Sequence, residues 1–521
     1  MQTTRRNFLR GMAGTSLFAI GGCKCAFGAQ KIKLAVVGVM GKGLTDWSTM
    51  YKSGAIEVVA MCDCDYSMRE MAQRAAVEMG LDIDLYRIPF YTDYRKLLDD
   101  AGILGVEAMT VSTPDHVHAP VAIGAMKQGI HVYVQKPLVR TLWELDYFEK
   151  TAKEYGVITQ MGNQGSSLDA MRRCTEVLQS GIIGDAKEVH VWTNRPVWPQ
   201  GKSVADWIKG HPNGDPVKSG LNWEAWLATA AKRPFLGEYG KDVKAYDPWD
   251  LGRNVYHTFT WRGIADFGCG AFGDMACHTM NLAFRGLELG TVTAAECVKI
   301  EEKNDIAYPT KSVVKMTYAA RDSKIRKGVR LPEVVLFWYD GFDETRPGKS
   351  GNKPTADVMP KVVKCFGEVP DTGCYIIGTK GCVLMQDDYG AKCAIAMNDE
   401  TRFVDVFEHE AAKAVPHSIP LRTDSKTVTG GSTVAMAGFA EGHYAEFVDA
   451  VRGVGPYYEQ THSRCFSDIE YSVPQMEGIL VGCIAQQVAG KLNWDCKKMS
   501  FVDNEAANAL VKPFIRKGWE F

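Results

Sequence analysis

The stretch AVVGVMGKG at residues 35–43 decides the fold that the first part of the chain is expected to adopt. It completes an apolar run over 32–37, which is typical of a short buried strand, and a glycine-rich turn follows. In the G-x-G-x-x-G dinucleotide-binding turn, the middle glycine lets the backbone approach a pyrophosphate. Gly38 and Gly43 hold the outer places here, whereas Met40 holds the middle one. The fragment alone therefore leaves two interpretations open, a cofactor turn and a strand-turn-helix that binds nothing.

The residues around this turn predict a parallel sheet. Short apolar runs alternate with helical patterns, such as SMREMAQRAAVEMG, from Lys31 to about Met161. This alternation is the signature of strands joined by crossover helices. The strand-like runs are IKLAVVG, IEVVAMCD, AMTVSTP, HVYVQKP and VITQMGN. We therefore expect a Rossmann-like domain over residues 30–162.

After Gly162 the pattern changes, because strand-like runs are no longer separated by regular helices. These runs include AKEVHVWTN, TAAECVKIE, SVVKMTYAA, EVVLFWYDG and GCVLMQDD. We expect a substrate-binding α+β domain over residues 163–521, built on a large and mostly antiparallel sheet, so that the whole chain is of the α/β class. Two stretches rich in Pro, Gly and Lys, about 345–373 and 410–432, are typical of long surface loops.

Composition narrows the range of partners. The chain has 521 residues and is 46% hydrophobic, enough for at least two buried cores, so we expect two or three domains. A formal net charge of −2 provides no basic stripe for a phosphate backbone, so we expect no nucleic-acid partner. The 15 cysteines are scattered, and Cys62 and Cys64 have no second pair at metal-binding spacing. We therefore expect no metal site.

The first 29 residues differ in kind from the rest. The segment TTRRNFLR resembles a twin-arginine export signal, and the weakly apolar run after it is too short and glycine-rich to span a bilayer. Cys23 partly resembles a lipoprotein attachment cysteine, and cleavage near Gly28 or Ala29 is the competing outcome. We expect export by the twin-arginine route to a periplasmic or lipid-anchored location, with Cys23 as the only link to the membrane.

An acidic residue supports the cofactor interpretation of the turn. Asp63 ends the second strand-like run, 20 residues past Gly43, where a carboxylate would accept the ribose hydroxyls of NAD. A carboxylate there would repel the 2′-phosphate of NADP, so NAD is favoured. A solvated aspartate at a strand end is the alternative for Asp63.

A longer segment resembles a known family. The stretch VSTPDHVHAPVAIGAMKQGIHVYVQKPL, residues 111–138, is similar to the signature region of the Gfo/Idh/MocA oxidoreductases, in which T-P-x-x-x-H and E-K-P line the nicotinamide site. The central WRGIADFGCGAFGDMACH and the C-terminal NWDCKKMSFVDNEAANALVKPFIRKGWEF resemble the secreted bacterial branch of that family. Gln135 replaces the glutamate of E-K-P. The resemblance and the turn together imply NAD contacts from Gly38, Val39, Met40, Gly41, Lys42, Gly43, Asp63, Thr113, Pro114, His118, Gln135 and Lys136.

The resemblance also implies catalytic residues. Asp274 and His278 are spaced four residues apart in GDMACH, so they share one face of a helix. In this interpretation His278 is the general acid/base, Asp274 orients it or joins substrate binding, and Lys136 holds a hydroxyl and the nicotinamide ribose. Imidazole suits the role because its ordinary pKa lies near neutrality. Without the family, a hydrogen-bonded helix start explains the D-x-x-x-H spacing equally well.

Candidate substrate contacts lie mainly in a tryptophan-rich region. Aromatic faces pack against sugar rings, so Trp192 and Trp198, which flank NRPV, are candidates for a sugar platform, whereas Trp223 and Trp226 are expected in a helix core. Three further residues are candidates for substrate contacts: Asn163, His257 and Arg262. For His257 and Arg262 a structural role is equally open.

Three functions follow from these features. The first is an exported, NAD-dependent oxidoreductase that transfers hydride between a tightly bound nicotinamide cofactor and a secondary hydroxyl or keto group of a sugar or glycoside. The second is an NAD-dependent glycosidase that works through transient oxidation, elimination, hydration and re-reduction. The third is a carbohydrate-binding protein without catalysis. An open sheet face in the second domain would suit self-association, so we expect a homo-oligomer.

Overall fold

The computed structural model describes residues 30–240, 243, 253–346, 348–422, 441–455 and 465–521. The expected export segment at 1–29, including Cys23, lies outside the described residues, as does part of the expected loop at 410–432. No helix among the described residues combines the length and the apolar character that crossing a bilayer requires. Within the same residues, no three His, Cys, Asp or Glu side chains are grouped as metal ligands would be.

The first domain is a parallel sheet of six strands in the order β3-β2-β1-β4-β5-β6. The strands are β1 (Ile32–Val37), β2 (Ile56–Cys62), β3 (Phe90–Tyr91), β4 (Ala108–Val111), β5 (His131–Val134) and β6 (Thr159–Met161). The connecting helices are α1 (Lys42–Lys52), α2 (Ser67–Glu78), α3 (Tyr94–Leu104), α4 (Asp115–Met126) and α5 (Leu142–Tyr155). This arrangement confirms the Rossmann-like fold expected from the alternating pattern.

The central strands are mostly apolar because both of their faces are covered. Leu34 and Val36 of β1 belong to the apolar cluster that includes α1 and α2, whereas Ala35 and Val37 belong to the cluster that includes α4 and α5. Successive side chains of a strand point to opposite faces, so a strand buried on both sides lacks a polar alternation. The mostly apolar run IKLAVV of β1 agrees with this burial on both faces.

The second domain contains a ten-stranded sheet in the order β16-β15-β14-β13-β7-β12-β9-β8-β17-β18. Its strands are β7 (Ala186–Trp192), β8 (Val292–Glu301), β9 (Lys311–Tyr318), β12 (Val334–Asp340), β13 (Gly373–Gly378), β14 (Gly381–Met385), β15 (Cys393–Met397), β16 (Val404–Asp405), β17 (Lys491–Asp495) and β18 (Ser500–Phe501). Among the described pairs of this sheet, β7 with β12 is parallel and the others are antiparallel. The expected α+β domain with a mostly antiparallel sheet is confirmed.

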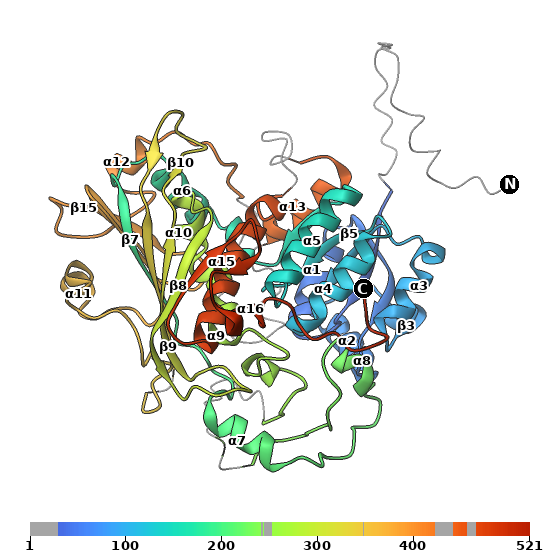
Figure 1. The fold of residues 1–521 in the computed structure, drawn as a ribbon. Helices are drawn as coiled ribbons and strands as arrows, with labels where there is room; N and C mark the ends of the chain where they lie inside the picture. Colours follow the sequence, from blue (N-terminus) through green and yellow to red (C-terminus); the bar gives the residue numbers. More distant parts are fainter. Residues whose placement is uncertain (1–29, 241–242, 244–252, 347, 423–440, 456–464) are drawn as a thin grey trace, which may run out of the picture.

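Helices of the second domain lie on the side of this sheet that faces the first domain (Figure 1). They are α6 (Asp169–Gln179), α9 (Gly270–Thr279), α10 (Asn281–Gly286) and α15 (Ile469–Gln487). Helix α15 contacts β8 and β9 of the large sheet and also α5 of the first domain. Helix α13 (Glu441–Arg452) packs on α1, so a late part of the chain returns to the first domain. The two domains therefore share a common packed interface.

Part of the long segment between β7 and α9, called the excursion and taken only over its described residues, packs against the first domain. It contains α7 (Lys202–Gly210), α8 (Trp223–Leu227) and the short η4 (Thr260–Gly263). The Asn222 N–H donates to the Cys64 carbonyl over 2.7 Å, and the Tyr66 N–H donates to the Gly220 carbonyl over 2.9 Å. Trp223 and Trp226 stack at 4.8 Å inside an apolar cluster, as their helical spacing predicted. The excursion thereby closes over the end of β2.

The remaining elements are short. The expected loop at 345–373 contains the helix α11 (Pro360–Phe366), and the described part of the loop at 410–432 contains α12 (Glu410–Lys413). The others are a hairpin of β10 (Arg321–Asp322) and β11 (Arg330–Leu331), the helix α16 (Glu505–Asn508), and the 3-10 turns η2 (Leu85–Arg87) and η3 (Gln164–Ser167).

The close approach of the turn to α1 yields the first prediction. A Cβ at Gly43, in the first turn of α1, would lie 1.9 Å from the Gly38 carbonyl oxygen, so Gly43→Ala should destabilise the protein by about 1–3 kcal/mol through overpacking. Gly102 is the matched control, because it also lies in a helix but a Cβ there meets no atom within 4 Å. Gly102→Ala should be neutral or stabilising. Equal denaturant midpoints for the two variants would contradict this packing.

Candidate functional site

The glycine-rich turn between β1 and α1 accommodates the methionine that departs from the fingerprint. Gly38 has a φ of 83°, and a Cβ there would lie 2.3 Å from the Ser112 carbonyl oxygen. Met40 is partly buried and packs against the apolar cluster of the first domain. Gly41, with a φ of 59°, precedes α1, and a Cβ built on it would meet no atom within 4 Å. The open space over the turn is therefore at Gly41 rather than at position 40.

Asp63 is fastened to this turn. Its Oδ2 accepts a hydrogen bond from the Val39 N–H over 3.2 Å, and its Oδ1 accepts one from the Asp65 N–H over 3.1 Å. Burial raises the pKa of the Asp63 carboxyl above its ordinary value. A turn at a helix N-terminus, with a carboxylate at the end of the adjacent strand, fits the pyrophosphate and ribose of a dinucleotide. The residues present thus fit NAD.

A buried carboxylate on α1 connects the turn to the strand ends. Asp46 is fully buried and accepts hydrogen bonds from Lys42 Nζ at 2.8 Å and from Ser112 Oγ at 2.7 Å. It also accepts from Gln135 Nε2 at 2.9 Å and from the Tyr444 hydroxyl at 2.9 Å. Lys42 Nζ donates to the Tyr444 hydroxyl as well, over 2.6 Å. The amide of Gln135, where the family motif has glutamate, is therefore paired with a carboxylate supplied by a different element.

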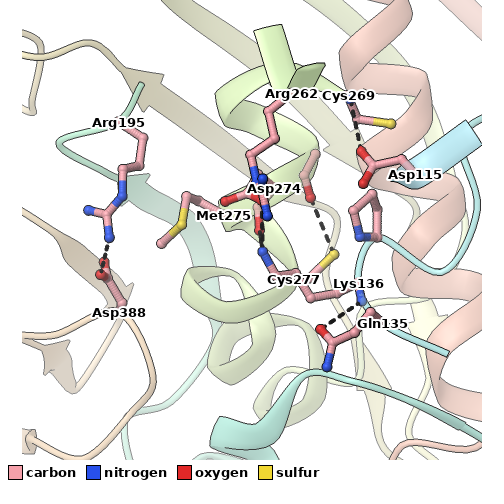
Figure 2. A network of polar contacts seen from close by, with 12 residues as sticks. Asp115, Gln135, Lys136, Arg195, Arg262, Cys269, Asp274, Met275, Cys277 and Asp388 are labelled. Carbon is pink, nitrogen blue, oxygen red and sulfur yellow. Dashed lines mark hydrogen bonds and ion pairs between the residues drawn. The ribbon is translucent and has the colours of Figure 1, made fainter. Parts of the chain in front are cut away.

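Three charged side chains from both domains meet beside this network. Lys136, after β5, donates to Asp274 Oδ1 over 2.8 Å and to the Asp274 carbonyl over 3.1 Å. Arg262 Nε lies 3.3 Å from the same Oδ1 (Figure 2). Burial alone would raise the pKa of Asp274, but Lys136 and Arg262 hold it below the ordinary range. Asp274 is consequently an anion that holds two cations in place.

His278 lies one helical turn beyond Asp274 on α9 and is 3% exposed. Burial, with Lys136 as the next cause, lowers the pKa of its imidazole well below the ordinary value. Its Nδ1 is buried and has no hydrogen-bond partner among the described residues, while the ring meets Tyr389 edge-on with centroids 4.8 Å apart. Because the ring is neutral at neutral pH, it is able to accept a proton.

The His118 ring links the two motif segments that contain Thr113 and Pro137. Its Nδ1 lies 2.7 Å from the Pro137 carbonyl oxygen and its Nε2 lies 2.9 Å from the Thr113 carbonyl oxygen. Burial lowers the pKa of His118 to about 4, and a neutral ring donates from only one nitrogen. The structure therefore places His118 between Thr113 and Pro137, the two motif segments, where it fixes their spacing.

Asp115, which follows Pro114 at the start of α4, joins that helix to α9. Its Oδ2 accepts a hydrogen bond from the Cys269 N–H over 3.1 Å. Burial raises the pKa of Asp115 to about 7, although Arg262 and Lys136 oppose the shift. A carboxyl group that exchanges its proton near neutral pH thus lies next to the Lys136 and Asp274 pair.

The structure brings some of the candidate substrate residues to this site. Arg262 is part of it, as described. Asn163 is fully buried at the start of η3, and neither amide atom has a hydrogen-bond partner among the described residues. Trp198 is 3% exposed, donates to Gln200 Oε1 over 2.9 Å, and has the Arg262 guanidinium 6.0 Å from its ring. Trp198 supports Arg262 rather than presenting an open aromatic face.

Two candidates are placed elsewhere. Trp192 has no exposed surface, donates to the Pro370 carbonyl over 2.7 Å, and packs in the apolar cluster that includes residues of α11. The expected platform at Trp192 is thus corrected, because a ring surrounded by protein cannot stack on a sugar. His257 Nε2 lies 3.2 Å from Asp65 Oδ2. His257 therefore lies beside the end of β2, near the turn that fits a dinucleotide.

Sequence reasoning missed several residues of the site. Contacts between distant segments bring five such residues to the site: Asp46, Tyr444, Arg195, Asp388 and Tyr389. For Arg195 a signal existed, because it lies in the polar NRP that follows a strand. For Asp46, which lies inside a helical pattern, and for Tyr444, 398 residues later, no local pattern marks the contact.

The chain is similar to known proteins in sequence and in fold. Residues 32–163 match the family model GFO_IDH_MocA, described as an oxidoreductase family with an NAD-binding Rossmann fold. A solved structure, an inositol dehydrogenase homolog from Azotobacter vinelandii, aligns with a TM-score of 0.54 and 15% identity over 89% of this chain and 98% of that one. The Gfo/Idh/MocA oxidoreductase family is supported. At this identity the structural likeness shows the fold alone.

Curated relatives match mainly over part of their length. The 2,7-anhydro-N-acetylneuraminate hydratase of Mediterraneibacter gnavus is 26% identical over 34% of this chain and 44% of its own. The glycosyl hydrolase family 109 protein 2 of Akkermansia muciniphila is 28% identical over 30% of this chain and 32% of its own. The matches thus span less than half of the length of either relative.

The Asp46 network yields the second prediction. Asp46→Asn replaces one acceptor oxygen by a donor, and the misplaced donors should cost at least about 1–3 kcal/mol of stability. The double variant Asp46→Asn with Gln135→Glu puts the carboxylate on the other member of the pair and should recover part of the loss. Thermal unfolding of the single and double variants measures both effects. Asp146→Asn, which breaks an exposed pair with Lys150, is the matched control and should change little. Wild-type stability of Asp46→Asn would refute the role given to this carboxylate.

Proposed function

We propose that the protein is an NAD-dependent oxidoreductase that transfers hydride between NAD and a secondary hydroxyl or keto group of a sugar or glycoside. The observation that carries the proposal is the neutral His278 imidazole beside the Lys136–Asp274 pair, next to a turn that fits a dinucleotide. NAD, when bound, supplies the hydride acceptor. The relatives named above act on carbohydrates by name, which supports the substrate class.

Each residue has a definite task in this proposal. His278 takes the proton of the substrate hydroxyl, because burial keeps its imidazole neutral and its Nδ1 has no hydrogen-bond partner among the described residues. Lys136, with Arg262 close by, stabilises the negative charge that develops on the hydroxyl oxygen. Asp274 holds both cations in position through its Oδ1. The three charged side chains are 11–19% exposed, so a ligand is able to reach them.

We propose that the cofactor is NAD rather than NADP and that the protein retains it tightly. The Asp63 carboxylate at the end of β2 would disfavour a 2′-phosphate. Retention is supported by the excursion over this end, where Lys218 Nζ lies 2.9 Å from Asp65 Oδ2 and His257 adds a second contact. These bonds fasten the second domain across the strand end that would hold the adenosine half.

A redox-neutral glycosidase is the second candidate. It is favoured by the relative named as a glycosyl hydrolase family 109 protein. In single turnovers a glycosidase would give a transient NADH absorbance at 340 nm with release of the aglycone, whereas a dehydrogenase would accumulate NADH. The oxidation step of both candidate reactions uses the same proton acceptor and the same cations.

We further propose that the chain is exported by the twin-arginine route, with support from TTRRNFLR. Arg5→Lys with Arg6→Lys should leave a folded, cofactor-loaded protein in the cytoplasm, because the route accepts folded proteins only with its signal intact. Fractionation followed by immunoblotting measures the outcome. Lys31→Arg with Lys33→Arg, outside the signal, is the control, and normal export of the first variant would remove this proposal.

The catalytic prediction concerns His278 and Lys136. His278→Ala should retain NAD and sugar but slow single-turnover reduction of bound NAD by ~100-fold or more, the scale of losing a positioned acid/base. Lys136→Ala should weaken sugar binding as well as the rate. Because the pKa of His278 is lowered, the wild-type rate should persist as the pH falls through 6.5, the ordinary histidine value. A His278→Ala rate equal to wild type at every pH would assign the Asp274 and His278 pair a structural role.

A further inference from the structure

A rigid turn of the second domain lies against His278. It joins β14 to β15, and Asp387 Oδ1 within it accepts hydrogen bonds from the N–H groups of Tyr389 at 2.7 Å and Gly390 at 2.8 Å. Asp387 Oδ2 accepts a further bond from the Lys392 N–H over 2.7 Å. One carboxylate thus binds several backbone N–H groups of the turn.

The turn contacts both the His278 ring and the first domain. Tyr389 meets the His278 ring at 4.8 Å, and its carbonyl oxygen would lie 2.3 Å from a Cβ at Gly165. Gly165 belongs to η3, which follows the first-domain strand β6. The close approach requires glycine at 165, and Asp388 is the residue that precedes Tyr389 in the turn.

Asp388 is paired with an arginine from another strand. Arg195 follows β7, and its Nη2 lies 3.3 Å from Asp388 Oδ2. Asp388 Oδ1 accepts a hydrogen bond from the Thr372 hydroxyl. The Arg195 and Asp388 side chains are 12% and 15% exposed, which matches the 14% of Lys136 and the 11% of Asp274. Figure 2 shows the pair on the far side of Met275 from the Lys136–Asp274 group.

The charges of the pair act on the catalytic residues. Arg195 is among the cations that lower the pKa of His278, after burial, Lys136 and Lys42. Asp388 and Asp274 both add to the burial that raises the pKa of the Tyr389 hydroxyl. Charges of both the Arg195–Asp388 pair and the Lys136–Asp274 pair therefore act on His278 or Tyr389.

We propose that Arg195 and Asp388 form a specificity subsite for adjacent hydroxyl groups of a neutral sugar, at the end of the substrate away from the oxidised carbon. This inference rests on the proposed function. A hydroxyl both donates and accepts, so neighbouring hydroxyls match a guanidinium donor next to a carboxylate acceptor. A sugar carboxylate would instead face Asp388, and two like charges side by side are unfavourable. The pair thus selects neutral sugars against uronic acids.

The test compares neutral hexosides with the corresponding hexuronosides on NAD-loaded protein. Wild type should bind and turn over the neutral members with a kcat/KM at least ~10-fold higher, the scale of one lost charged contact. Asp388→Asn should raise KM for neutral members by ~10-fold with a smaller effect on kcat, and should reduce the discrimination against uronosides. Arg195→Lys, which keeps the charge but not the fork, should also raise KM.

Controls separate failure of the subsite from failure of the proposed function. Asp322→Asn breaks an exposed pair with Arg330 in the β10–β11 hairpin and should leave every constant unchanged. Retained NAD and the unfolding midpoint show that each variant is folded. Unchanged KM values and preferences in Asp388→Asn, or a wild type that prefers uronosides, would overturn the subsite while the oxidoreductase stands. A folded, NAD-loaded wild type that neither binds nor oxidises any sugar would overturn the proposed function and the subsite together.

Discussion

The site depends on one buried negative charge. Asp46 has no exposed surface, and a carboxylate removed from water is tolerated only when donors surround it. Its donors come from the start of α1, the segment after β4, the end of β5 and helix α13, so the charge fixes the relative positions of four elements. Residues that would contact the cofactor are on three of them. The same contact explains why α13, from the C-terminal part of the chain, packs on the first domain.

Burial, and after it the cations near His278, lower the pKa of its imidazole. Lys136, Lys42 and Arg195 all disfavour a charged imidazole, whereas Asp274 alone among the named charges favours it. In a buried, low-dielectric site such terms are large compared with their values in water. The ring is therefore a base that releases its proton readily, and the pKa of Asp115, about 7 because of burial, supplies a second proton-exchanging group nearby. The arrangement suits an alkoxide-forming step, in which positive charge must be available before the proton leaves.

Local patterns predicted the strands, the glycine-rich turn and the helical spacing of Asp274 and His278, because each is a property of a few consecutive residues. The Asp46 network and the Arg195–Asp388 pair could not be predicted, since their members are separated by up to 402 and by 193 residues. Trp192 shows the opposite error. Its neighbours in sequence indicated a sugar platform, but α11, inside a stretch interpreted as a loop, contributes to the cluster that covers the ring.

The two halves of the site belong to different domains, and this division has a physical consequence. Lys136 leaves a strand of the first domain, whereas Asp274 and His278 are on α9 of the second. Their alignment therefore depends on the packing between domains, to which α15 contributes by contacting both α5 and the large sheet. A shift of that helix would change the distance between Lys136 Nζ and Asp274, now 2.8 Å, without altering either domain internally. Since the strength of a charged contact depends steeply on geometry, the interface between the domains is as much a determinant of the chemistry as the side chains themselves.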